Sequence, residues 1–119
     1  MFENETAELI RRFNDAFRFH QPEALRELVA DDCVIENTHP APEGMRCVGR
    51  EACLSVWQAL AAARDSQFEL EEVLVAGERA VIRWRYRFGP GPADWNRGVN
   101  LMRVRGGRIV EAMGYLKGP

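Results

Sequence analysis

The sequence lacks any apolar stretch that could cross a bilayer, which takes about 20 consecutive apolar residues. Its longest apolar runs, at residues 60–63 and 73–76, are far too short. The N-terminal segment is acidic, with Glu3 and Glu5, and has no apolar region of the signal-peptide type. We therefore expect neither a membrane protein nor a secreted one.

Paired cysteines are also missing. The three cysteines, Cys33, Cys47 and Cys53, are an odd number without close spacing, which favours reduced thiols in a cytoplasmic protein. A reactive thiol is the alternative. No His/Cys spacing is typical of a metal site, and neither a phosphate-binding glycine loop nor a Ser-His-Asp order is present. We therefore expect no metal and no cofactor.

An excess of positive charge is absent as well. Sixteen Lys and Arg residues against 18 Asp and Glu residues give a net charge of −2, which argues against a nucleic-acid binder that relies on phosphate contacts. The chain has 46% hydrophobic and 29% charged residues, so we do not expect disorder. Its 119 residues predict a single domain, 1–119, with a core that needs no disulfides.

Helical periodicity is concentrated in the first half of the chain. An apolar stripe of period 3.6 predicts a helix from about residue 5 to 19 and includes Phe13 and Phe17. Pro22 suits the first turn of a short second helix. A strand is expected at 33–38, followed by a break at the proline-rich residues 39–44, and a third helix is expected at 50–64.

The second half reads as four strands, at 67–76, 79–88, 98–105 and 108–116. Gly77-Glu78 and Gly106-Gly107 are hairpin signals between them. The order α-α-β-α-β-β-β-β predicts an α+β fold with helices on one face of a mainly antiparallel sheet.

Alternation along 80–88 separates two faces of this sheet. Trp84 and Tyr86 point toward the helices, while an outer row contains Arg83, Arg85 and Arg87. We expect Glu69 and Glu71 to lie across from Arg87 and Arg85, in opposite-charge pairs; an anion site is the alternative role for the arginines.

The inner face carries one polar group and one gap. Its expected members are Trp84, Tyr86, Asn100, Met102, Val104, Val110, Ala112 and Gly114. A polar Asn100 beside the missing side chain of Gly114 predicts a pocket. The alternative is a hydrogen-bonded core asparagine and a packing glycine.

Four segments carry a resemblance to a known family: residues 28–37, 48–52, 97–104 and 107–111, together with the order of elements. The chain resembles the SnoaL-like, ketosteroid-isomerase-like branch of the nuclear transport factor 2 superfamily. The resemblance implies a cone-shaped α+β barrel, in which the helices pack on a strongly curved sheet around a pocket. It also implies a homodimer formed through the outer faces of the sheets. One such scaffold hosts many activities.

The functional residues of ketosteroid isomerases do not match this chain. Those enzymes place a proton-transferring aspartate at the position of Asn37 and a protonated aspartate at that of Asn100. Phe13 stands where their tyrosine assists the oxyanion. No carboxylate is expected on the inner face, so the resemblance does not imply a steroid isomerase.

His39 is the candidate base, because it follows Asn37 by two residues and an imidazole changes charge near neutral pH. A loop histidine without a chemical role is the alternative. Tyr86 and Asn100 are the other candidate catalytic residues. Trp95 is a candidate lid. The remaining candidate ligand-binding residues are Phe13, Phe17, Asn37, Trp57, Trp84, Met102 and Gly114.

These residues favour a protein with a pocket for a small hydrophobic molecule. One hypothesis is a cofactor-free isomerase or cyclase that acts on a hydrophobic cyclic carbonyl compound. A non-catalytic binder of small apolar ligands and a dimeric interaction module with a vestigial cavity are the alternatives.

Overall fold

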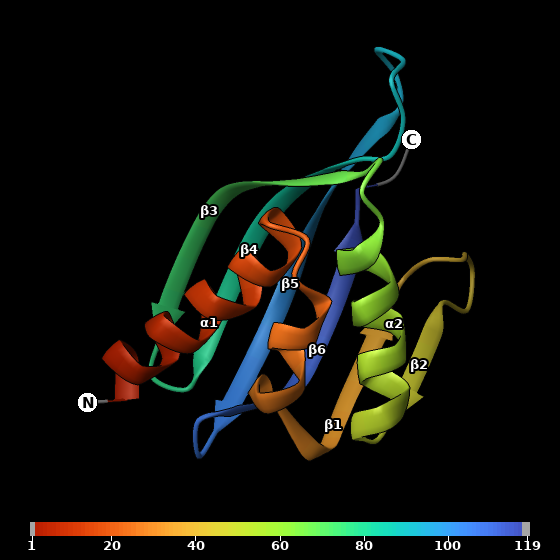
Figure 1. The fold of residues 1–119 in the computed structure, drawn as a ribbon. Helices are drawn as coiled ribbons and strands as arrows, with labels where there is room; N and C mark the ends of the chain where they lie inside the picture. Colours follow the sequence, from red (N-terminus) through yellow and green to blue (C-terminus); the bar gives the residue numbers. More distant parts are fainter. Residues whose placement is uncertain (1, 118–119) are drawn as a thin grey trace.

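The helices all lie on one side of the sheet. The computed structural model describes residues 2–117, and it contains α1 (Phe2–Arg18), the 3-10 helix η1 (Pro22–Leu28) and α2 (Arg50–Ala62) (Figure 1). The predicted second helix is therefore a 3-10 helix, with Pro22 in its first turn as expected. None of the helices in this part of the chain is long and apolar enough to cross a membrane.

A single six-stranded sheet forms the other layer. Its strands are β1 (Val29–Asn37), β2 (Met45–Val48), β3 (Gln67–Ala76), β4 (Arg79–Arg87), β5 (Trp95–Arg105) and β6 (Arg108–Leu116), in the order β2-β1-β6-β5-β4-β3. Strands β1 and β6 run parallel, and the other neighbours are antiparallel. The predicted α+β class and the mainly antiparallel sheet are confirmed. The sheet is strongly curled but open, rather than closed into a barrel.

Several strand boundaries differ from the sequence prediction, among them the start of β5 at Trp95 rather than residue 98. Strand β1 starts at Val29 rather than residue 33, and the short strand β2 was not predicted. Both predicted hairpins are present. The glycines at their turns, Gly77, Gly106 and Gly107, have φ values of 61°, 58° and 77°, a region that glycine adopts without steric cost.

The predicted register between β3 and β4 is wrong by two residues. Glu69 lies opposite Arg85 rather than Arg87, and the register shifts between Leu70 and Glu72. A bulge adds one residue to a strand, and here the extra residue is Glu71, which the pairing with β4 skips. Its carboxylate forms an ion pair with Arg97 at 3.1 Å. The outer face is nevertheless the predicted lattice of opposite charges, since Glu69 also lies 3.4 Å from Arg87.

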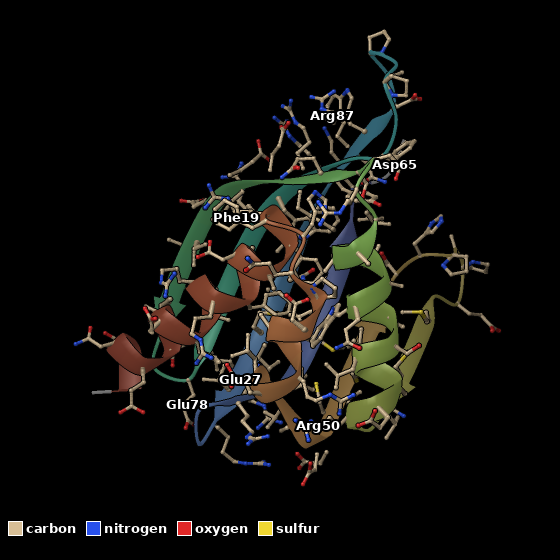
Figure 2. All side chains as sticks on the ribbon, in the orientation of Figure 1. Phe19, Glu27, Arg50, Asp65, Glu78 and Arg87 are labelled. Carbon is tan, nitrogen blue, oxygen red and sulfur yellow. The ribbon has the colours of Figure 1, made fainter. Side chains whose placement is uncertain are left out.

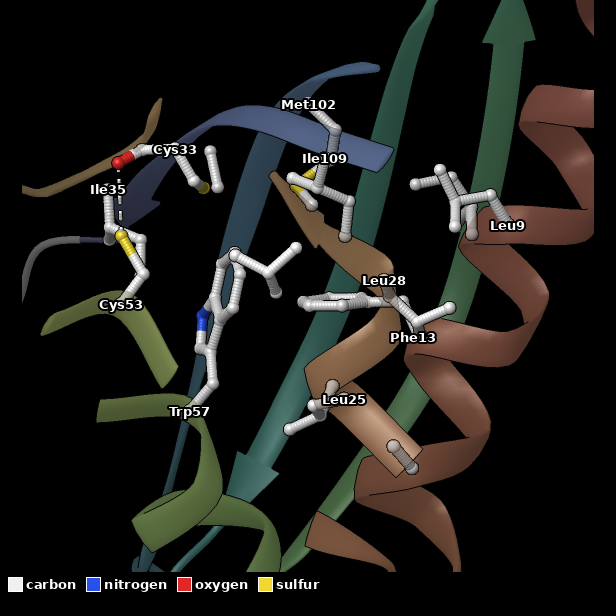
Figure 3. Close-up of a cluster of buried hydrophobic side chains, with 14 of the residues drawn as sticks. Leu9, Phe13, Leu25, Leu28, Cys33, Ile35, Cys53, Trp57, Met102 and Ile109 are labelled. Carbon is white, nitrogen blue, oxygen red and sulfur yellow. Dashed lines mark hydrogen bonds between the residues drawn. The ribbon is translucent and has the colours of Figure 1, made fainter. Parts of the chain in front are cut away.

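The hydrophobic core joins both long helices to the inner face of the sheet. Phe13 of α1 and Trp57 of α2 meet edge to face with ring centroids 4.9 Å apart, and Met102 and Ile109 belong to the same buried cluster (Figure 3). One end of the molecule is marked by Phe19, Asp65 and Arg87 (Figure 2). The site described next lies toward this end, beyond the core.

Candidate functional site

A cavity of about 310 Å³ lies between the helices and the inner face of the sheet. Six aromatic side chains form one part of its wall: Phe13, Phe17, Trp57, Phe68, Trp84 and Tyr86. Aliphatic atoms and one glycine complete the apolar part: Met45, Leu60, Leu70, Ile82, Gly114 and Leu116. A mostly apolar concave wall with a few polar groups is typical of a small-molecule site.

Six further polar side chains line the same cavity: Asn14, Arg18, Asn37, His39, Asn96 and Asn100. Within the described residues, this lining contains no carboxylate. Its hydrogen-bonding groups are therefore mainly neutral amides, and Arg18 is its one permanent charge.

Trp84 and Asn100 form a fixed unit on the floor of the cavity. The indole of Trp84 lies across Gly98 of β5, where a Cβ atom would stand 2.3 Å from indole Cζ2. Its Nε1 donates a hydrogen bond of 3.1 Å to Oδ1 of Asn100. An indole nitrogen can only donate, so this contact fixes which end of the Asn100 amide is oxygen. Among residues 2–117, the NH2 group of Asn100 has no hydrogen-bond partner, so it can donate to a ligand.

Asn37 meets Asn100 above Gly114. The parallel pairing of β1 with β6 sets Asn37 beside Gly114, and the antiparallel pairing of β5 with β6 sets Asn100 on its other side. A Cβ atom on Gly114 would lie 2.3 Å from Asn37 Oδ1 and 3.2 Å from Asn100 Oδ1. The missing side chain of Gly114 thus makes room for both amides, which is the gap beside a polar group that the sequence indicated.

His39 lies on the exposed side of this site. Thr38 anchors the chain just before it, because its backbone N–H donates to the Gly114 carbonyl at 2.9 Å and its hydroxyl accepts from the Leu116 N–H at 3.0 Å. His39 itself is exposed, yet it belongs to the cavity lining. It therefore stands at the mouth, on the same strand end as Asn37.

Tyr86 extends the aromatic wall toward the mouth. Its ring is half-buried and lies 4.4 Å from the ring of Phe68, centroid to centroid. It pairs across the strands with Asn96. Its hydroxyl makes no hydrogen bond within residues 2–117, so it is free for a ligand or for water.

Two expected site residues lie elsewhere. Met102 is fully buried in the core cluster and does not contribute to the cavity lining. Trp95 lies on the outer face of the sheet, with the Arg85 guanidinium 4.5 Å and the Arg97 guanidinium 5.6 Å from its ring. Trp95 is therefore not placed to cover the cavity.

Asn96 was missed because the predicted strand began at residue 98, although β5 begins at Trp95. Alternation continued two residues back from Gly98 would have placed it on the same face as Asn100. Arg18 and Asn14 were missed because they share the polar arc of α1 with solvent-exposed residues. The helical pattern alone does not distinguish polar side chains that line a cavity from those that face solvent.

Cys33 and Cys53 are buried in the core, Cys47 is half-buried against it, and none of the three lines the cavity. Cys53 Sγ donates to the Cys33 carbonyl oxygen at 3.4 Å (Figure 3). Burial, followed by the nearby Cys53, raises the pKa of the Cys33 thiol well above its usual range. Among the described residues, no three His, Cys, Asp or Glu side chains are grouped to hold a metal ion.

A curled sheet that wraps two helices around an aromatic cavity defines an NTF2-like protein. The SnoaL-like domain matches residues 10–112, most of the sequence. This chain therefore belongs to the SnoaL-like family, and the predicted resemblance is confirmed.

Three solved structures illustrate the likeness. An NTF2-like protein of unknown function from Mesorhizobium loti is 58% identical, with a TM-score of 0.93 over 99% of this chain and 95% of that one. A "putative polyketide cyclase" from Sinorhizobium meliloti is 27% identical, with a TM-score of 0.72 over 90% and 93%. A "putative ketosteroid isomerase" from Kribbella flavida is 20% identical, with a TM-score of 0.81 over 98% and 81%. No curated protein matches this chain.

Proposed function

We propose that this protein binds a small, largely apolar cyclic carbonyl compound in its cavity. The observation that carries the proposal is an aromatic wall that ends at two converging amides, Asn37 and Asn100. The volume of about 310 Å³ is about twice that of a 150 Å³ cavity that takes up one benzene ring. A compound of two fused rings suits that space.

The amides define the polar end of the ligand. Because Asn100 Oδ1 already accepts from Trp84, its NH2 group is the part left to donate. A carbonyl oxygen of the ligand accepts this bond, while its rings pack against Phe13, Trp57 and Trp84.

We propose proton transfer as a second function of the same site, because His39 stands at its mouth. A carbonyl held by Asn37 and Asn100 makes the adjacent carbon more acidic. The imidazole of His39 takes a proton from that carbon, and the electron pair moves onto the oxygen, where the two amides donate to it. The proton returns to a different carbon in an isomerisation. In a cyclisation the new carbanion instead attacks a second carbonyl carbon of the same molecule. The π pair of that C=O bond moves onto its oxygen, which takes back the proton from the His39 imidazolium.

Binding and chemistry are tested separately. Thermal shift and calorimetry with 1-tetralone, fused lactones and steroids test the pocket, and a ligand at 100 times its Kd adds about 2.7 kcal/mol of stability. Deuterium uptake in D2O at the carbon next to the ketone then reports proton abstraction, whatever the natural product is.

His39→Gln should bind the same ligand and lose the accelerated exchange. His20→Gln is the matched control, because His20 Nδ1 contacts the Ala61 carbonyl at 3.0 Å and His20 is not part of the lining. If a ligand binds but its deuterium uptake is no faster than in buffer, the protein is a non-catalytic binder and the proton-transfer proposal is refuted. A panel without any binder would refute the pocket proposal itself.

We also propose that the outer sheet face forms the homodimer that the resemblance implies. Leu101 and Tyr115 on adjacent strands are 39% and 49% exposed there, beside the Arg and Glu lattice. Sedimentation of the wild type against Leu101→Asp tests this. A monomeric wild type would refute it.

A further inference from the structure

Arg18 gives the cavity mouth a positive charge that its neighbours neutralise only weakly. Its guanidinium lies 3.5 Å from Asp15, whose carboxylate is also held by Arg11 at 2.7 Å. The guanidinium also lies 5.2 Å from the ring of Phe19. The side chain is 47% exposed, so it can turn toward a ligand.

The amides in the cavity offer donors rather than acceptors. Asn100 Oδ1 is already bonded to Trp84, and Asn37 Oδ1 is turned down onto Gly114. The Oδ1 atom of Asn96 is fully covered, so a ligand does not reach it as an acceptor. With no carboxylate in the lining, this region offers a ligand hydroxyl no charged acceptor.

The donors also lie at two separate places. Asn37 and Asn100 meet at Gly114, on the floor of the cavity. Arg18 is the last residue of α1, next to Phe19 at the end of the molecule shown in Figure 2. A ligand that satisfies both must carry acceptors at opposite ends.

We propose that the ligand is a two-ring keto acid, with its ketone oxygen at Asn37 and Asn100 and its carboxylate at Arg18. The inference rests on the proposed binding function and narrows its ligand class. In this arrangement the ligand's rings pack against the aromatic wall, and its ketone oxygen accepts hydrogen bonds at the floor. Arg18 makes the carboxylate bind more tightly than a neutral analogue.

The test uses three probes that differ only at the predicted anionic end: 1-tetralone-6-carboxylate, its methyl ester and 1-tetralone. Calorimetry measures each Kd with the wild type, Arg18→Gln and Arg12→Gln. Arg12 is the matched control, because it lies on the same helix, is paired with Glu27, and does not line the cavity.

For the wild type we expect the carboxylate to bind about five-fold more tightly than the ester, since a partly exposed ion pair contributes ~1 kcal/mol. Arg18→Gln should remove this preference, and Arg12→Gln should keep it. Added salt should weaken the binding of the carboxylate alone.

Ester or ketone binding as tightly as the acid would overturn the keto-acid inference and leave the proposed function standing. A preference for the acid that survives Arg18→Gln would overturn the role of Arg18. If none of the three probes binds the wild type, both the inference and the binding of two-ring carbonyl compounds fail.

Discussion

Gly98→Ala tests whether close packing at the cavity floor holds the Trp84–Asn100 unit. A Cβ atom at this position would lie 2.3, 2.5 and 2.9 Å from three indole atoms of Trp84. All three distances are below those that carbon contacts tolerate, and an indole is rigid. The ring must therefore move, and its hydrogen bond to Asn100 is lost with it.

The expected cost follows from three contributions. Overpacking costs about 1–3 kcal/mol, and the lost hydrogen bond adds about 1 kcal/mol. Replacing glycine by alanine also stabilises the folded state by about 0.4–1 kcal/mol, because it reduces the conformational entropy of the unfolded chain. The net loss is roughly 1–3 kcal/mol, which lowers Tm by about 4 °C per kcal/mol in a domain of this size.

Thermal and urea unfolding of four proteins measure this loss: the wild type, Gly98→Ala, Trp84→Leu and the double variant. Leucine does not reach the position of the indole, so Gly98→Ala should be neutral or slightly stabilising in the Trp84→Leu background. Gly114→Ala is a second control, because its closest contact is the mobile end of Asn37. Equal costs of Gly98→Ala in both backgrounds would refute the packing argument.

Two further predictions concern ionisable groups outside the cavity. A thiol reagent at pH 8 should modify Cys47 quickly in the folded protein and all the cysteines after unfolding, because burial raises the pKa of the Cys33 thiol; two or more fast thiols would contradict this. The hydrogen bond from Arg105 lowers the pKa of the exposed Asp32 carboxyl. The pair therefore stabilises the folded state at pH values above the pKa that Asp32 has in the unfolded chain. This stabilisation is lost as the pH falls through the lower pKa that Asp32 has in the folded protein. An NMR titration of Asp32 should have a midpoint below the ordinary range of an aspartate, which Arg105→Gln raises and Arg46→Gln leaves unchanged.

The sequence was sufficient where the signal is local. Gly77-Glu78 and Gly106-Gly107 mark their hairpins through turn chemistry, and the alternation of Trp84 and Arg85 identifies the two faces of β4. The third helix was found by its apolar stripe. In each case, a few neighbouring residues determine the structure.

Features that depend on distant partners could not be read in this way. Strand β2 is four residues long, and only its pairing with β1 makes it a strand. The bulge between Leu70 and Glu72 shifts a register that charge pairing alone had placed two residues away. Alternation likewise assigned Met102 to the correct face, but it carries no information on depth, and Met102 lies in the core below the cavity.

The amide side chains of Asn37 and Asn100 determine how ligand binding at this end of the cavity depends on pH. An asparagine NH2 group donates at every accessible pH, whereas a carboxyl group donates only when it is protonated. Two carboxyl groups meeting over Gly114 would also raise each other's pKa. With amides there, ligand binding at this end does not require a trapped proton. A pH dependence of binding or exchange then arises from the other titratable groups of the lining, His39 and Tyr86, or from the ligand. Comparing the pH profiles of wild type, His39→Gln and Tyr86→Phe separates these sources.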